Sequence, residues 1–130
     1  MNQAVQIFVF LNLVVIGLSH LIQPQAWVSF FKVLRGYGHA GAFANGFLSL
    51  TFGSIIVGFH WVWEGIVPTI ITCLGIAQII KSLVSFVAPA VGLRSMSRPA
   101  AENPLSYRIG GILFLAIATL QLLYFFAIIY

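Results

Sequence analysis

The side chains that could support chemistry are few, and the segment GFHWVWEG at residues 58–65 holds the densest group of them. This segment combines His60 with Trp61, Trp63 and Glu64. A histidine beside a carboxylate could transfer protons or help to bind a metal ion. The same composition is also typical of a short turn between two membrane spans, where tryptophan rings lie at the level of the lipid headgroups.

The remaining reactive side chains do not complete a catalytic or metal-binding set. The chain has two acidic residues, Glu64 and Glu102, and we expect them on opposite sides of a membrane, where they cannot act as a pair. The three histidines lack neighbouring clusters of carboxylates, and the single cysteine, Cys73, cannot form an internal disulfide or a cysteine-based metal site alone. Walker loops and dinucleotide fingerprints are also missing. We therefore predict no catalytic residues, no metal site and no cofactor.

The composition predicts an integral membrane protein. Of the 130 residues, 61% are hydrophobic and only 6% are charged, whereas a soluble domain carries about 25% charged residues. A membrane-spanning helix needs about 20 mostly apolar residues, and four segments meet this requirement: 4–22, 40–60, 66–87 and 109–130. The expected fold is one all-α domain over residues 1–130, a bundle of four transmembrane helices.

The basic residues indicate the orientation of this bundle. Five of the six Lys and Arg residues lie in the loops 24–39 and 89–108, and Lys81 lies in the third span towards the second of these loops. Cytoplasmic loops carry an excess of Lys and Arg, so we expect both loops in the cytoplasm and both termini outside it. The long side chain of Lys81 can extend to the cytoplasmic surface.

Aromatic residues are expected at both membrane surfaces. In the first basic loop, aromatic residues recur at helical spacing with two cations between them, which predicts a short amphipathic helix lying in the interface. Such a helix is either an ordinary anchor or a surface on which a lipid or a partner docks. The residues expected at the surfaces are Trp27, Phe30, Phe31, His60, Trp61, Trp63 and Lys81.

The second span is rich in small residues at a spacing of four. Such pairs let helix backbones approach closely in lipid, where packing drives helix association. We expect this stripe to face other helices, within one chain or between copies. Its residues are Ala42, Gly46, Ser49, Gly53, Ser54 and Gly58.

Several polar side chains fall inside the spans, where they must find partners within the protein. We expect them to face the interior of the bundle, and they are Asn12, His20, Asn45, Ser49 and Gln78. His20 is the sharpest functional candidate because its charge can change near neutral pH. An ordinary histidine bonded to its own helix near the boundary is the alternative.

A weak internal repeat appears when the chain is shifted by 58 positions. The matched pairs include Gly17 with Gly75, His20 with Gln78, Leu21 with Ile79, and Gly53 with Gly111. Each half then reads helix, basic loop, helix. Because both halves have the same orientation, the repeat predicts two parallel helix hairpins related by an axis along the membrane normal.

One sequence pattern resembles that of a family of small bacterial inner-membrane proteins with four helices and no known activity. The pattern is H-x-V-W, then P-x-I-I-T-x-x-G, then a lysine six residues later, and it runs here from His60 to Lys81. The segment GLSHLIQPQAW also resembles the first span and turn of that family. This chain departs from the pattern at Trp61, where an asparagine is usual, and at Ile76, where an aromatic residue is usual. The resemblance implies a bacterial inner-membrane location.

Three functions remain open at the level of sequence. The first is a non-enzymatic membrane protein that self-associates or serves as a subunit of a membrane complex, with the lipid bilayer as its surroundings. The second is a channel or transporter that passes a small neutral or anionic solute along the polar interior. The third is a redox component that binds quinone or haem, which only the histidines favour. Nucleic acid is not an expected partner.

Overall fold

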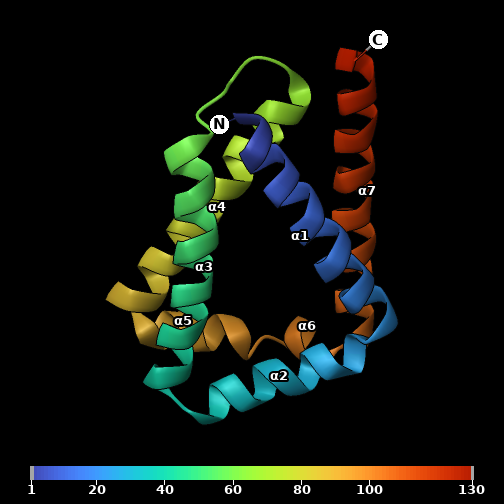
Figure 1. Ribbon diagram of the computed structural model, residues 1–130. Coiled ribbons are helices and arrows are strands. Elements are labelled where there is room, and N and C mark those ends of the chain that lie inside the picture. The colour runs from blue at the N-terminus through green and yellow to red at the C-terminus, as the bar shows by residue number, and fades with distance from the viewer. Residues whose placement is uncertain (1, 130) are drawn as a thin grey trace.

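The computed structural model describes the backbone of residues 2–129 and shows a chain built from helices (Figure 1). The described residues contain no strand. The helices are α1 (Asn2–Ile22), α2 (Pro24–Gly36), α3 (His39–Phe59), α4 (Ile66–Val87), α5 (Pro89–Met96), α6 (Pro99–Glu102) and α7 (Pro104–Ile129).

Four helices are long and apolar enough to cross a membrane, and they are α1, α3, α4 and the stretch Pro104–Ala127 of α7. The expectation of an all-α protein with four spanning helices is therefore confirmed. The bounds agree closely except that α7 begins at Pro104 rather than at residue 109. Proline suits the first turn of a helix, because that position needs no backbone donor, and α2, α5 and α6 begin in the same way.

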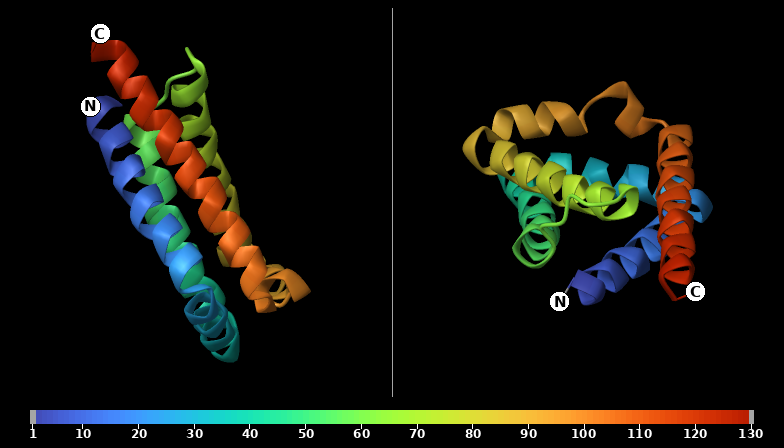
Figure 2. Two further views of the ribbon diagram at one scale, coloured as in Figure 1. Left: turned by 90° about the vertical axis from the view of Figure 1, so that its right-hand side faces the viewer. Right: turned by 90° about the horizontal axis from the view of Figure 1, so that it is seen from above.

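The four long helices form two closely packed pairs, α3 with α4 and α1 with α7. The two pairs make few contacts with each other. One end of the molecule carries α2, α5 and α6, which lie across the long helices, and the other end carries both termini and residues 60–65 (Figures 1 and 2). We name these the basic end and the hairpin end. The basic end holds the two loops rich in Lys and Arg, as the sequence predicts.

The helix pairs cross at glycines, and the two crossings are equivalent. A Cβ added at Gly53 on α3 would lie 2.9 Å from the carbonyl oxygen of Gly75 on α4. A Cβ added at Gly111 on α7 would lie 2.7 Å from the carbonyl oxygen of Gly17 on α1. The shift of 58 positions relates one crossing to the other, so the contacts support the repeat. The close pairs join helices of different halves, however, whereas the expected helix hairpins would pair α1 with α3 and α4 with α7.

An apolar core fills the space between the two helix pairs on the hairpin-end side of the molecule. Its buried residues come from all four long helices. They are apolar side chains on the helix faces that point inward, as apolar periodicity predicts. They are Val5, Val9, Leu13, Ile56, Ile71 and Ala118. A second, smaller cluster at the basic end joins Leu34, Ala42 and Met96.

Candidate anion-binding site at the basic end

A cavity of about 710 Å³ lies at the basic end, between the two helix pairs. Its walls come from α2, α3, α4, α5, α6 and α7, so it closes only when the two basic loops fold against the long helices. Part of the wall is apolar and includes Phe31, Val84 and Val91. A volume of this size is typical of a pocket for a small organic ligand.

Three cations line the cavity, and no acidic residue does. Lys81 comes from α4, Arg94 from α5, and Arg98 from the turn before α6. None of the three forms an ion pair with a residue that the structure describes. The one ion pair at this end joins Arg35 to Glu102, with 3.4 Å between nitrogen and oxygen. Glu102 directly follows Ala101, which lines the cavity, but Glu102 itself does not line it and pairs with Arg35 instead.

A buried amide also contributes to the wall of the cavity. Asn45 on α3 is only 7% exposed and lines the cavity. Its side chain makes no hydrogen bond with any residue in the described part of the chain, and its amide atoms are not fully enclosed by protein, so they are open to a ligand in the cavity. Two other polar groups in the wall are satisfied within the protein, because Ser85 donates to the carbonyl of Lys81 and Tyr107 donates to the carbonyl of Ala101.

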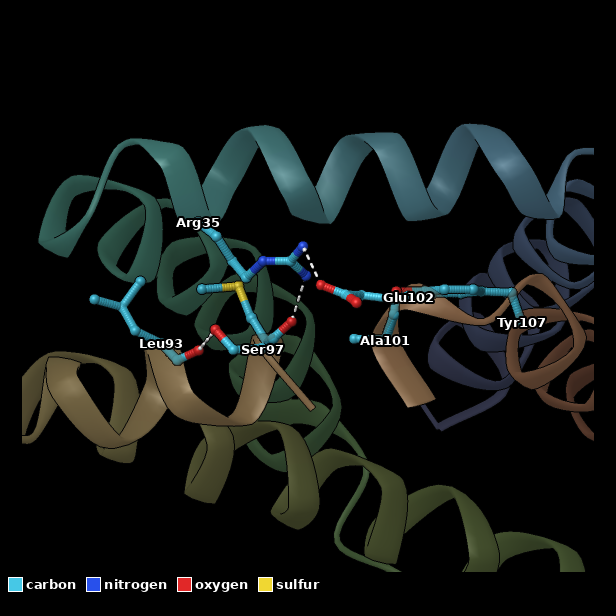
Figure 3. Close-up of polar contacts among 7 residues, drawn as sticks. Arg35, Leu93, Ser97, Ala101, Glu102 and Tyr107 are labelled. Carbon is cyan, nitrogen blue, oxygen red and sulfur yellow. Dashed lines mark hydrogen bonds and ion pairs between the residues drawn. The ribbon is translucent and has the colours of Figure 1, made fainter. Parts of the chain in front are cut away.

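The loops that form the cavity are tied together by Arg35. Its Nη1 donates to the backbone carbonyl of Met96 at 2.6 Å, which joins α2 to the end of α5. Figure 3 shows the guanidinium of Arg35 between α2 and the α5–α6 segment, beside Glu102. Tyr107 reaches across to α6 in the same view. These contacts fix α5 and α6 over the basic end.

The hairpin end holds a buried polar cluster. Gln6 on α1 donates through Nε2 to Nε2 of His60, at 3.2 Å. The other ring nitrogen of His60 donates to the hydroxyl of Thr72 on α4, at 3.3 Å. Gln121 on α7 donates to the backbone carbonyl of Gln6, at 3.1 Å. The cluster thus links both helix pairs, and the Gln121 Oε1 atom has no partner among the described residues.

The burial of His60 differs from the expectation that it lies at the membrane surface with the two tryptophans. The imidazole is 0% exposed, whereas Trp61 and Trp63 are 60% and 48% exposed. The reason is that α3 ends at Phe59 and the chain then turns inward, towards Gln6. Burial lowers the pKa of the His60 imidazole below its ordinary value. The cluster therefore favours the neutral ring.

The expected polar interior is not one continuous set. Asn45 and Ser49 are buried on α3, but Asn12 donates to the carbonyl of Phe8 in its own helix. His20 likewise bonds the carbonyl of Ile16, at 2.8 Å. Gln78 lies at the crossing with Gly53. Of the five candidates, only Asn45 lines the cavity.

His20 belongs to an aromatic junction at the basic end. Its ring stacks on Trp27, with 4.2 Å between ring centroids, and meets Phe114 edge-on. Trp27 in turn donates to the hydroxyl of Ser19. Among the other residues expected at the surfaces, Phe30 and Lys81 are exposed and Phe31 is partly buried.

The small residues of α3 serve mostly inside the chain. Ala42 and Ser49 are buried, and a Cβ added at Gly46 would lie 3.0 Å from the side chains of Ser85 and Phe86 on α4. Gly53 packs on α4 as described above. Ser54 and Gly58 are exposed, and Gly58 has nothing nearby.

Several residues of these two sites escaped the sequence reasoning. Gln6 and Gln121 are polar residues inside apolar spans, so the same rule that selected Asn45 could have found them. Arg94, Arg98 and Tyr107 have no such signal, because only the folded loops bring them to one cavity. No group of three or more potential metal ligands occurs among the described residues. Comparison with known protein families, characterised proteins and solved structures found no match to this chain.

Proposed function

We propose that this chain is a non-enzymatic protein of a bacterial inner membrane that works by binding an anionic ligand at its basic end. The observation that carries the proposal is the cavity lined by Lys81, Arg94 and Arg98 without an acidic residue. Like charges around one cavity repel each other, and a bound anion relieves that repulsion. Since loops rich in Lys and Arg remain in the cytoplasm, the cavity faces the cytoplasm and both termini face away from it.

The lining of the cavity supports binding rather than catalysis. It contains serines but no histidine, aspartate or glutamate, which are common general acids and bases and could activate a serine as a nucleophile. The redox alternative gains little support, because both ring nitrogens of His60 already take part in hydrogen bonds.

Transport of an anion is the second candidate function. The equivalence of the two glycine crossings under the 58-position shift favours it, because parallel repeats are a common architecture of transporters. The cavity lies at one end, while the apolar core and the Gln6–His60 contact lie towards the other. This arrangement suits a carrier whose site is accessible from the cytoplasm. Its test is uptake of radiolabelled phosphate into proteoliposomes.

Self-association, or a place in a larger complex, remains a proposal with less support. Within the stripe of small residues that favoured it, Gly46 and Gly53 pack on α4, and Ala42 packs on α2 and α5. Only Ser54 and Gly58 of that stripe are left on an exposed face.

Thermal unfolding of the detergent-solubilised protein tests the anion site. Inorganic phosphate is compared with chloride at equal ionic strength, and we expect phosphate to raise the Tm. A ligand at a hundred times its Kd stabilises by about 2.7 kcal/mol. The variant Lys81→Gln/Arg94→Gln/Arg98→Gln should lose the shift. The matched control Lys32→Gln/Arg108→Gln removes exposed cations of the same end that do not line the cavity, and should keep it.

A further inference from the structure

The cavity at the basic end combines positive charge with an apolar wall, and this combination restricts the class of anion. Phe31, Val84 and Val91 supply much of the wall that is not cationic. A small inorganic anion would satisfy the cations but leave these side chains facing an empty volume. An amphiphile with one anionic group and an apolar remainder would satisfy both.

The depth of the cavity matches the headgroup level of a bilayer. Lys81 lies six residues before the end of α4 at Val87, which corresponds to about 9 Å along a helix. Arg94 and Arg98 follow in the loop that lies across the end of the spans. Because a lysine side chain can extend towards the membrane surface, we expect all three cations at the level of the phosphates of the adjacent leaflet, where basic pockets between membrane helices suit anionic headgroups.

The acyl chain of a ligand in the cavity would lie between α4 and α7. α4 and α7 both line the cavity but belong to different pairs, and they make few contacts with each other. Among the described residues, the polar side-chain contact between the two pairs lies at the hairpin end, where Gln6 of α1 meets His60 just after α3. Because α2, α5 and α6 cover the basic end itself, an acyl chain would leave the cavity sideways, between α4 and α7.

We propose that the cavity binds an anionic phospholipid, with its phosphate held by Lys81, Arg94 and Arg98 and its glycerol or headgroup hydroxyls at Asn45. The unpartnered amide of Asn45, 7% exposed, is the group that a headgroup hydroxyl or phosphate oxygen would satisfy. The first acyl carbons lie along Val84 and Val91. This inference rests on the proposed function, because it names the class of anion that the same cavity takes.

Native mass spectrometry tests the inference. The protein is incubated with equal amounts of phosphatidylglycerol and phosphatidylcholine, and the lipid retained is measured with and without millimolar glycerol 1-phosphate. We expect retention of phosphatidylglycerol that glycerol 1-phosphate does not displace. Each cation near an anionic lipid surface contributes roughly fivefold in affinity, so the Lys81→Gln/Arg94→Gln/Arg98→Gln variant should bind on the order of a hundredfold more weakly. The Lys32→Gln/Arg108→Gln variant is the matched control.

The outcomes separate this inference from the proposed function. Equal retention of both lipids, with glycerol 1-phosphate bound in the cavity, would show a site for a free phosphate ester and overturn the phospholipid. Failure to bind lipid, glycerol 1-phosphate and inorganic phosphate alike would overturn both. Circular dichroism shows whether the triple variant is folded, and Asn45→Ala, which leaves the charges in place, should reduce retention of phosphatidylglycerol even if the triple variant fails to fold.

Discussion

Gly111 on α7 packs directly against Gly17 on α1, with 2.7 Å between the ideal Cβ position of Gly111 and the carbonyl oxygen of Gly17. The same Cβ would meet Cβ of His20 at 2.9 Å and the backbone nitrogen of Leu21 at 3.0 Å. At the other crossing, a Cβ on Gly53 would meet the corresponding atoms of Gly75, Gln78 and Ile79 at 2.9, 3.0 and 3.0 Å. His20 and Gln78 are therefore equivalent packing positions in two copies of one helix crossing.

Alanine at either crossing should destabilise the protein to a similar degree. Gly111→Ala and Gly53→Ala each place a methyl group against backbone, which has to move, so we expect a loss of about 1–3 kcal/mol. The matched controls are Gly110→Ala and Gly58→Ala, because nothing lies within 4 Å of the added Cβ at either position. Unfolding in mixed detergent measures the difference. Unchanged stability in Gly111→Ala and Gly53→Ala would contradict the crossing geometry.

The spans, the first basic loop helix and the common side of the cations could be predicted because they depend on composition and local periodicity. Residues 24–36 form the expected helix since Trp27, Phe30 and Phe31 repeat at helical spacing. The four spans follow from hydrophobicity and length alone. These properties are local, so no knowledge of packing is needed to find them.

The site could not be predicted because it depends on contacts between distant segments. Arg35 meets Met96 across 61 positions, and Gln6 meets His60 across 54. The sequence around His60 is typical of a surface turn, and only the position of Gln6 on α1 makes burial of the imidazole favourable. The helices α5 and α6 span only 8 and 4 residues, too few for a helical periodicity to stand out, so the loop 89–108 carried no clear signal for them.

Removing the side chain of Gln6 should weaken the contact between the two helix pairs. Gln6→Ala leaves the backbone carbonyl that Gln121 uses but deprives the buried Nε2 of His60 of its donor. We expect a loss of about 1–2 kcal/mol, the range for polar contacts between membrane helices. Thermal unfolding measures it. Asn12→Ala is the control, because Asn12 bonds only its own helix, and an equal loss in both variants would count against a specific role for Gln6.

Acidification should destabilise the protein through His60. Its pKa in the folded protein is lowered from 6.5 by burial, so between the two values the unfolded chain binds a proton that the folded chain lacks. Stability then rises with pH through this window and falls as the pH is lowered from 6.5. The Tm measured from pH 8 to pH 5 should drop more in the wild type than in His60→Gln. A parallel drop in both proteins would assign the effect to other groups.

Arg35 should matter more to the basic end than its ion pair suggests. Arg35→Met removes the donor to the Met96 carbonyl, and we expect faster hydrogen exchange over residues 89–102 because α5 and α6 lose their tie to α2. Glu102→Gln should change little, since Glu102 is 65% exposed and surface ion pairs contribute about 0–1 kcal/mol. If hydrogen exchange over residues 89–102 became faster in Glu102→Gln than in Arg35→Met, the ion pair would matter more than the bond to the Met96 carbonyl.

Leucine at Gly46 should unfold the α3–α4 pair rather than only change the size of an assembly. An added Cβ already lies 3.0 Å from Ser85 and from Phe86 on α4, and three further carbons have no space between packed helices. We expect Gly46→Leu to lose helicity and aggregate, while Gly58→Leu on the same helix stays folded because its surroundings are open. Circular dichroism and size-exclusion chromatography in detergent distinguish the cases. A Gly46→Leu protein that is fully helical but smaller than the wild-type particle would place this stripe at a contact between copies.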